Sequence, residues 1–334
     1  KVSRVEVAAK FFSPPPETIL RELLESKQIT PEEASLAASI PVAQDVTGEA
    51  DSGGHTDNRP LVTILPSLLA LRDSLQARHG YADPLRVGAA GGISTPGSVA
   101  AAFAMGAAYV LTGSVNQACV ESGTCDAVRA MLAQAAQADT AMAPAADMFE
   151  MGVKVQVLKR GTMFAMRAAK LYEAYKSCAG ISGIPAAQKA SLERELFRAP
   201  LEDIWRQTRE FFLKRDPSQV ERAERDPKHQ MALVFRWYLG LASRWANAGE
   251  PGRYLDYQIW CGPAMGAFNE WVRGSFLEAP AQRSVASVAL NLLFGASYLA
   301  RVRALCRQGV AVDPDVQRFA PMTLSSIQPL LEVQ

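Results

Sequence analysis

His55, one of only three histidines in the chain, follows two glycines in the segment GEADSGGHTDNRP at residues 48–60. Gly53 and Gly54 have no side-chain bulk, so a backbone or a flat ligand can approach this segment closely. An imidazole with its ordinary pKa of about 6.5 gives or takes a proton near neutral pH. The segment therefore predicts an acid–base residue beside a closely packed group. A histidine that only caps a loop is the alternative.

A second candidate site follows a predicted strand in VGAAGGIST, at residues 87–95. Gly91 and Gly92 lead from the strand into a helix, whose first backbone N–H groups form a ready anion site. The spacing matches neither the GxGxxG of a dinucleotide fold nor a P-loop. A phosphate site and a plain tight turn both remain open for this segment alone.

The same arrangement returns one βα unit later, in VLTGSV at residues 110–115. Gly113 and Ser114 end the next predicted strand and add a hydroxyl group to the exposed N–H groups. Two consecutive strands with such loops are typical of the phosphate site of a TIM barrel, which follows strands seven and eight. We expect His55 at the C-terminal end of the preceding strand, and therefore on the same face of the barrel.

Short apolar runs alternate with amphipathic helical stretches over the first part of the chain, a pattern that indicates βα units and a parallel sheet. The predicted strands are residues 40–46, 85–90 and 107–113. Between and before them we predict helices around Leu20–Leu24, from Thr30 with a capping box to Glu33, over residues 65–75 and over residues 100–105.

The character of the sequence changes near residue 146. GVKVQVL at residues 152–158 alternates like a strand, and the sequence after it is mostly helical. We therefore predict an α/β fold in which residues 1–146 are the C-terminal half of a TIM (β/α)8 barrel. Residues 147–334 are predicted to be a mainly helical extension.

Composition limits the classes of function. The 334 residues carry 35 Lys and Arg against 34 Asp and Glu, so a net charge of +1 supplies no overall field for nucleic acid or an anionic membrane. The apolar stretch at residues 99–111 is too short to span a bilayer. Five cysteines without a CxxC pair indicate reduced thiols in the cytoplasm and no metal site. His79 and His229 are expected in polar turns or on helix surfaces.

The order GGH, AAGGI and TGS resembles the FMN-dependent nitronate monooxygenase (2-nitropropane dioxygenase-like) barrels. The likeness is greater to one branch, the PfaD-type trans-acting enoylreductases of polyketide and polyunsaturated fatty-acid synthases. It extends over nearly the whole chain and rests on these phrases: RVEVAAKFFSPPP, EADSGGHTDNRPL, RVGAAGGI, GAAYVLTGSVNQACVE, MAPAADMFEMGVKVQVLKRGTMFAMRAAKLYE and RWYLGLASRWANAGEPGRYLDYQIWCGPAMGAFN.

The resemblance implies roles for the site residues. His55 would transfer a proton beside the isoalloxazine ring of FMN, and Asp51 and Arg167 would lie on the substrate side. The residues expected to bind FMN are Gly53, Gly54, Gly91, Gly92, Gly113 and Ser114.

The implied reaction is reduction of an enoyl thioester on an acyl carrier protein, with NADPH as the source of hydride. An acidic carrier protein would fit a patch formed by Arg236, Arg244, Arg253 and Arg273. A homo-oligomer remains open, whereas nucleic acid and membrane are not expected as partners.

The start of the chain departs from the family pattern, because residues 1–4 resemble the end of barrel strand five. We expect strands six to eight here, with the other half of the barrel removed or supplied from elsewhere. Two further functions stay open: oxidation of alkyl nitronates with His55 as base, and a half-barrel scaffold without catalysis.

Overall fold

The computed structural model describes residues 1–332, and contacts within the chain divide it into two compact units. The first unit comprises Lys1–Ser52, Thr56–Glu121 and Pro263–Gln334. The second comprises Gly53–His55 and Ser122–Gly262.

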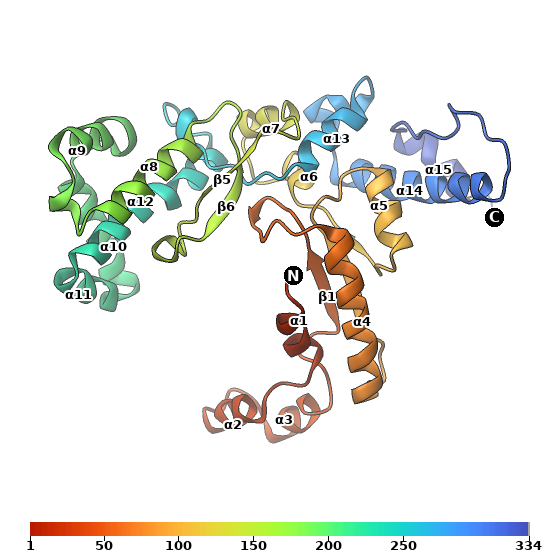
Figure 1. The fold of residues 1–334 in the computed structure, drawn as a ribbon, viewed down its shortest axis with the longest axis horizontal. Helices are drawn as coiled ribbons and strands as arrows, with labels where there is room; N and C mark the ends of the chain where they lie inside the picture. Colours follow the sequence, from red (N-terminus) through yellow and green to blue (C-terminus); the bar gives the residue numbers. More distant parts are fainter. Residues whose placement is uncertain (333–334) are drawn as a thin grey trace. The chain divides into compact units, whose positions relative to one another are not determined.

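A parallel sheet of three strands lies at the centre of the first unit. Its order is β1 (Asp45–Glu49), β3 (Arg86–Ala90) and β4 (Val110–Leu111), and Val2 adds a parallel bridge to Gly48 at the outer edge of β1. Helices α4 (Leu61–His79) and α5 (Pro96–Ala104) connect the consecutive strands, and α4 lies along β1 (Figure 1). This succession of parallel strands and crossover helices is the arrangement of a TIM barrel.

The helices of this unit include the two short ones predicted before β1. Thr30 caps the second of them, with Glu33 N–H donating to Thr30 Oγ1 at 3.2 Å and Thr30 N–H donating to the Glu33 carboxylate at 2.8 Å. The predicted capping box is therefore confirmed. The helices are α1 (Val5–Phe12), α2 (Glu17–Glu25), α3 (Pro31–Ala37), α4 (Leu61–His79), α5 (Pro96–Ala104), α6 (Ser114–Gln117), α13 (Ala264–Val272), α14 (Val285–Arg307) and α15 (Leu324–Glu332), with single 3-10 turns at Phe276–Glu278 and Pro280–Gln282.

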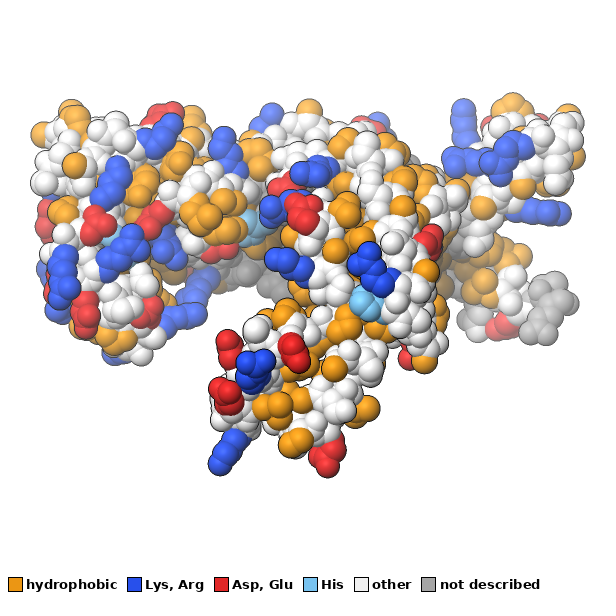
Figure 2. All heavy atoms as spheres, turned by 60° about the horizontal axis from the view of Figure 1, so that its bottom comes forward, with side chains coloured by type: hydrophobic (Ala, Val, Ile, Leu, Met, Phe, Trp, Pro, Cys, Tyr) orange, Lys and Arg blue, Asp and Glu red, His pale blue; other side chains and the backbone are white. Residues whose placement is uncertain are grey.

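The first barrel strand lies later than predicted. Ile40 and Val42 are 54% and 50% exposed, whereas the strand begins at Asp45 and continues through Gly48. A Cβ on Gly48 would come within 2.9 Å of Leu68 Cδ1, so the absence of a side chain lets α4 pack on the strand. The strand was predicted at residues 40–46 because that segment is rich in apolar residues, and this position was wrong. The observed strand β1 instead has a glycine, Gly48, on the face that packs against α4. Figure 2 shows apolar side chains exposed over the α2–α3 insertion.

Helix α14 is the longest apolar helix of this unit and packs on α5. Its length and its mean hydropathy of 1.5 over an 18-residue window would suit a membrane span, and 39% of that window is buried inside the protein. It also buries the polar Asn291, which donates to Ser287 O and Met322 O at 2.9 and 2.8 Å. A core helix of a globular protein passes the same length and hydropathy test.

The second unit is built on an antiparallel sheet in the order β2 (Gly54–His55), β6 (Lys154–Leu158) and β5 (Thr140–Pro144). Helix α8 packs on β5, and α12 packs on α8, so the sheet and helices share one apolar core around Phe149, Phe235 and Tyr238. The helices are α7 (Asp126–Ala133), α8 (Phe164–Ser177), α9 (Ala186–Leu192), α10 (Leu201–Arg215), α11 (Pro217–Arg225) and α12 (Pro227–Ala248), with a π-helical turn at Glu193–Phe197 and 3-10 turns at Phe149–Met151, Ile181–Gly183 and Tyr254–Asp256.

The division of the chain by contacts differs from the boundary predicted at residues 146–147. That boundary falls between β5 and β6, which pair along their whole length from Thr140↔Leu158 to Pro144↔Lys154. The strand predicted at residues 152–158 is therefore present, but its partner strand was missed. The assignment of residues 1–146 to the barrel and 147–334 to an extension stays a prediction.

Candidate active site

The turn after β3 holds Gly91 and Gly92, both in the left-handed region with φ of 81° and 72°. A Cβ on Gly91 would come within 2.5 Å of the Ala50 carbonyl carbon, so Gly91 packs against the end of β1. Gly92 is exposed, and a Cβ there would meet no atom within 4 Å. The first glycine thus closes the turn, and the second presents bare backbone.

Gly113 follows β4 and is also exposed, with no atom within 4 Å of a Cβ built on it. Ser114 begins the short helix α6 directly after it. Because Ala90 pairs with Leu111 in the parallel register of β3 and β4, the two glycine turns leave the same edge of the sheet. The predicted pairing of these two loops within the first unit is confirmed.

The two open glycines leave backbone N–H groups available to an anion such as a phosphate group. In the described part of the chain, residues 1–332, neither the Gly92 N–H nor the Gly113 N–H donates a hydrogen bond. Adjacent turns that expose N–H groups and no side chains form an anion-binding concavity. These two residues would therefore hold the phosphate, while flavin contacts for the full predicted set stay predictions.

Asp51 stabilises the loop that follows β1. Asn58 Nδ2 donates to Asp51 Oδ1 at 2.7 Å, and the Asp51 N–H donates to Arg59 O at 3.0 Å. These bonds close the loop over residues 51–59. The predicted role of Asp51 toward a substrate stays a prediction.

The glycine pair before the histidine packs against the chain itself. A Cβ on Gly53 would come within 2.8 Å of Cys261 N, and a Cβ on Gly54 would come within 2.8 Å of the Trp260 ring. Gly54 also has a φ of 81°. The close approach predicted for this pair exists, and it is made to Trp260 and Cys261. Contact with a flavin ring stays a prediction for Gly53 and Gly54.

The sequence predicts His55 at the C-terminal end of a barrel strand, and this prediction is wrong. Strand β1 ends at Glu49, and His55 belongs to β2, where it pairs with Val155 of β6 in the second unit. The sequence suggested otherwise because the loop of residues 50–53 leaves no apolar signal between the two strands. The imidazole packs edge-on against Trp260, with ring centroids 5.8 Å apart and an interplanar angle of 80°.

Asp147 orients the imidazole of His55. Nε2 lies 3.1 Å from Asp147 Oδ1, and the two side chains are 36% and 61% exposed. Since a carboxylate accepts hydrogen bonds, this contact places a proton on Nε2. Nδ1 has no hydrogen-bond partner among residues 1–332, so it is the nitrogen left to exchange a proton with a ligand.

Arg167 is engaged inside the second unit. It lies on α8 and donates to the fully buried Asp256, which precedes Trp260 by four residues. Burial alone would lower the pKa of Arg167, but the hydrogen bond and charge of Asp256 raise it above its ordinary value. The arginine therefore stabilises the 253–257 turn, and its predicted role toward a substrate stays a prediction.

The other two histidines differ from each other. His79 stacks on Tyr81 with ring centroids 5.2 Å apart, in the exposed position that we expected. His229 is only 2% exposed, and its ring nitrogens lie 2.6 Å from the Glu150 carboxylate and 3.0 Å from Gln219 Oε1. The prediction of a surface position was wrong for His229, because α11 and the 149–151 turn cover it.

The four arginines predicted to form one docking patch do not share one unit. Arg273 belongs to the first unit, and Arg236, Arg244 and Arg253 belong to the second. Arg253 is largely buried, with 12% of its side chain exposed. On the face shown in Figure 2, Lys and Arg are interspersed with Asp and Glu, in keeping with the net charge of +1.

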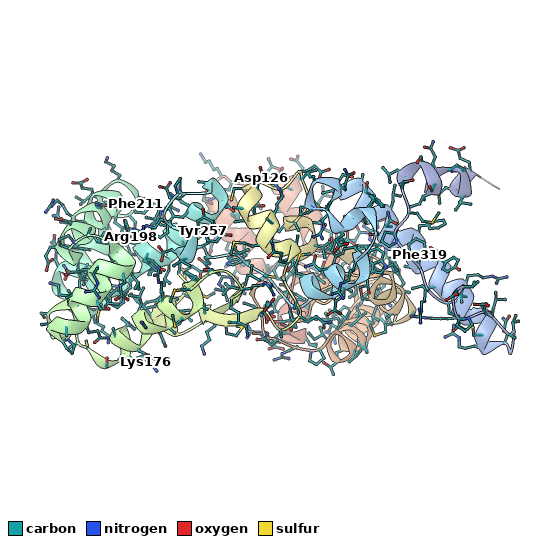
Figure 3. All side chains as sticks on the ribbon, turned by 90° about the horizontal axis from the view of Figure 1, so that it is seen from above. Asp126, Lys176, Arg198, Phe211, Tyr257 and Phe319 are labelled. Atoms are coloured by element: carbon teal, nitrogen blue, oxygen red, sulfur yellow. The ribbon has the colours of Figure 1, made fainter. Side chains whose placement is uncertain are left out.

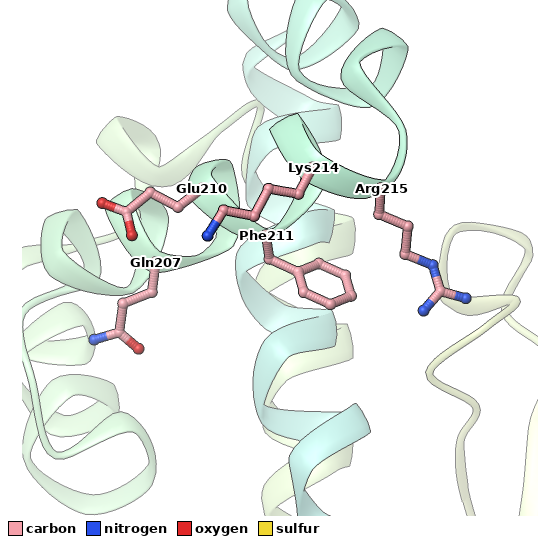
Figure 4. A pocket seen from close by; sticks show the side chains of 5 residues that line it. All are labelled: Gln207, Glu210, Phe211, Lys214 and Arg215. Atoms are coloured by element: carbon pink, nitrogen blue, oxygen red, sulfur yellow. The ribbon is translucent and has the colours of Figure 1, made fainter.

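A shallow cavity of about 610 Å³ lies on the outer face of α10 (Figure 4). None of the predicted site residues lines it. Its lining residues are Gln207, Glu210, Phe211, Lys214 and Arg215.

Asp147 and Trp260 are functional candidates that sequence reasoning did not single out. Both lie within phrases that resemble the enoylreductase branch, MAPAADMFEMG and YQIWCGPA. Their separation from His55 in sequence hides the contacts, which arise only when β5, β6 and the 259–261 segment assemble around β2.

Comparison with known proteins identifies the family to which this chain is similar. Residues 30–197, half of the chain, match the family model described as nitronate monooxygenase. Residues 178–257 match a model described as the inserted helical domain of [acyl-carrier-protein] S-malonyltransferase, which covers α9 to α12.

Two curated relatives match most of this chain. It is 51% identical over 327 residues to a polyunsaturated fatty acid synthase component of Thraustochytrium sp., in a match that covers 96% of this chain and 22% of that protein. It is 47% identical over 293 residues to the polyketide biosynthesis protein PksE of Bacillus subtilis, covering 88% of this chain and 38% of that one. The chain thus spans well under half the length of these relatives.

One solved structure is similar to most of this chain. The enoyl reductase domain of MlnA, from the macrolactin biosynthesis cluster of Bacillus amyloliquefaciens, has a TM-score of 0.85 and 40% identity, covering 91% of this chain and 67% of that one. The chain therefore belongs to the nitronate monooxygenase family. Within that family it lies in the branch of PfaD-type enoylreductases. The predicted fold class is confirmed: part of a TIM barrel with a mainly helical region.

Proposed function

We propose that this chain takes part in the FMN-dependent reduction of α,β-unsaturated (enoyl) thioesters carried on an acyl carrier protein. NADPH would be the reductant, and the setting would be polyketide or polyunsaturated fatty-acid synthesis in the cytoplasm. The observation that carries the proposal is the 40% identity to the enoyl reductase domain of MlnA over 91% of this chain. Five cysteines without a disulfide support the cytoplasmic location.

The first unit would bind the cofactor through its phosphate. The unpaired N–H groups of Gly92 and Gly113 can donate to phosphate oxygens, and the open space at both residues lets the phosphate approach the backbone. Bound flavin supplies the hydride chemistry, in which NADPH is oxidised and the β-carbon of the enoyl thioester is reduced.

His55 would give the proton that completes the reduction at the α-carbon. Asp147 holds the imidazole through Nε2, which leaves Nδ1–H of the protonated ring to donate to the substrate. Overall, one enoyl thioester, one NADPH and one proton become the saturated thioester and NADP⁺. Trp260 packs on the imidazole edge and restricts its rotation.

Oxidation of alkyl nitronates is the second candidate, and the match of residues 30–197 to the nitronate monooxygenase model favours it. His55 would then act as a base. In that reaction a nitroalkane, and not NADPH with an enoyl thioester, would exchange electrons with the flavin.

The test is a spectrum followed by two anaerobic reactions. Purified protein with added FMN is expected to show bound-flavin absorbance, to bleach with NADPH and to recover its colour with an enoyl thioester on a carrier protein. Bleaching by a nitroalkane without any response to NADPH and enoyl thioester would establish the second candidate instead. Folded protein that binds no flavin would rule out both enzymes for this chain alone and favour a scaffold role.

A further inference from the structure

A buried carboxylate in the second unit is surrounded by cations. Asp256 is fully buried and accepts a hydrogen bond from Tyr238 Oη at 2.7 Å. Three guanidinium groups donate to the same carboxylate, those of Arg167, Arg198 and Arg253.

The charges of this cluster do not balance. Three arginines share the single carboxylate of Asp256, so among residues 1–332 two of the three positive charges have no acid partner of their own. Burial lowers the pKa of Arg253, and the nearby charge of Arg198 lowers it further. An uncompensated positive charge in a partly buried site attracts an anion, because a second negative group would relieve the repulsion.

Arg253 and Arg198 have different roles in this arrangement. Arg253 is 12% exposed and also donates to Leu196 O at 2.5 Å and Phe197 O at 3.1 Å. The Arg198 side chain is 42% exposed, and its one side-chain hydrogen bond among residues 1–332 goes from Nη2 to Asp256 at 3.3 Å. The remaining donors of Arg198 are therefore open to a ligand from solvent. Figure 3 labels Arg198 on the ribbon of the second unit.

The backbone at Arg198 is unusual. Its φ is 57°, a left-handed conformation that few non-glycine residues adopt, and it directly follows the π-helical turn Glu193–Phe197. Both features cost free energy and are concentrated at ligand sites in proteins. They hold the Arg198 side chain against Asp256, on the open side of the cluster.

The cluster is connected to the histidine site by a short segment. Residues 259–261 run antiparallel to β6, with Leu158 N–H donating to Ile259 O at 2.8 Å, and Trp260 packs on His55. Trp260 follows Asp256 by four positions, so their Cα atoms lie at most about 14 Å apart. The buried cluster and the partner of His55 therefore lie on one short segment of the second unit.

We propose that Arg198, supported by Arg253 and Arg167, binds the phosphate group of a phosphate ester. The inference rests on the proposed function only for the source of that phosphate. Two ligands would offer such a phosphate group: the phosphopantetheine arm of the carrier protein, and NADPH with the phosphate on its adenosine ribose. A guanidinium fork suits phosphate oxygens better than any other cationic side chain does.

Calorimetric titration of the full chain tests the proposal with two probes, phosphopantetheine and adenosine 2′,5′-bisphosphate. Pantetheine and adenosine 5′-monophosphate are the matched probes without the relevant phosphate. The variant is Arg198→Asn, because asparagine tolerates left-handed backbone better than most residues. The control is Arg215→Gln, which removes an exposed charge of the same unit and leaves the Asp256 cluster intact.

We expect one probe to bind, with its affinity lowered at least about tenfold by Arg198→Asn and unchanged by Arg215→Gln. Phosphopantetheine binding would assign the site to the carrier arm, and bisphosphate binding would assign it to the dinucleotide. Binding of neither probe, or binding that Arg198→Asn leaves unchanged, would overturn the proposal. Neither probe contains an enoyl group or needs flavin, so this result is independent of the spectrum that tests the proposed function.

Discussion

Two pairs of glycines in this chain serve opposite purposes. Gly92 and Gly113 in the first unit have open space where a side chain would be. Gly53 and Gly54 in the second unit lie against Trp260 and Cys261, within 3 Å of where a Cβ would stand. The first pair leaves room for a ligand, and the second pair lets two segments of the chain pack together.

The difference shows how to interpret a glycine near a candidate site. A glycine-rich segment beside a histidine suggests a flat ligand, yet here the neighbour of Gly54 is an indole ring of the same chain. That ring then packs on His55. The second pair therefore helps to position the imidazole, and the first pair exposes N–H groups.

Loss of the imidazole gives the largest expected effect. With His55→Ala, the rate of enoyl reduction should fall by about 10²- to 10⁴-fold, because proton transfer loses its positioned donor. FMN affinity should change little, since the open glycines belong to the other unit. Stopped-flow kinetics and a flavin titration measure the two effects. A variant that keeps its turnover would remove the catalytic role of His55.

Asp147→Asn tests whether the carboxylate beside His55 supports the function of the imidazole. The amide keeps the shape of the side chain but not the charge that holds Nε2–H, so the rate should fall by only about tenfold. Glu150, whose carboxylate bonds His229 and not His55, offers a matched control as Glu150→Gln. An equal loss in both variants would mean that the effect on His55 is indirect.

Gly54→Ala should destabilise the protein by about 2–4 kcal/mol, because the new Cβ collides with the indole and the backbone is left-handed. Urea denaturation measures the change in the free energy of unfolding. Gly80→Ala is the control: Gly80 has a φ of 63° but no atom within 4 Å of a Cβ, so only the backbone strain applies. Equal losses for the two variants would contradict the packing of Gly54 on Trp260.

Gly113→Ala should leave stability within about 0.5 kcal/mol, because Gly113 has a φ of −110° and open space around it. The affinity for FMN should fall about tenfold, since a methyl group then occupies the approach to the N–H donor. Flavin fluorescence titration measures this. Gly240→Ala, at an exposed position of α12 with open space, should not affect the affinity. Unchanged binding by Gly113→Ala would remove this turn from the phosphate site.

The smallest effect concerns Cys261, whose backbone packs on Gly53. Burial raises the pKa of the Cys261 thiol from 9.0 to about 12, and the charge of Asp139 adds to the rise. The folded protein thus favours the neutral thiol, so this contribution to stability is complete below pH 9.0 and is lost as the pH rises through about 12. At pH 8 a thiol reagent should label the partly exposed Cys306 well before Cys261. Gly54→Ala should speed the labelling of Cys261, and equal rates in the native protein would contradict its burial.

Local signals in the sequence predicted much of the first unit. The capping box from Thr30 to Glu33 depends on neighbouring residues only, and it forms as expected. The same holds for the glycine turn at Gly91–Gly92, because the strand before it and the helix after it both have clear patterns. The predicted position of strand β1 was wrong because the reason for a glycine at position 48 is its contact with Leu68, twenty residues away in the sequence.

In the second unit, local signals were not enough. The partners of His55, Asp147 and Trp260, are 92 and 205 residues away in the sequence, and they meet it only through the pairing of β2, β5, β6 and the 259–261 segment. The amino-acid sequence by itself determined the βα pattern and the glycine turns, and it made His55 the candidate acid–base residue. Only the tertiary structure decided what fills the space beside each glycine, which carboxylate orients the imidazole, and that three arginines share Asp256, because these depend on long-range contacts that no local pattern encodes.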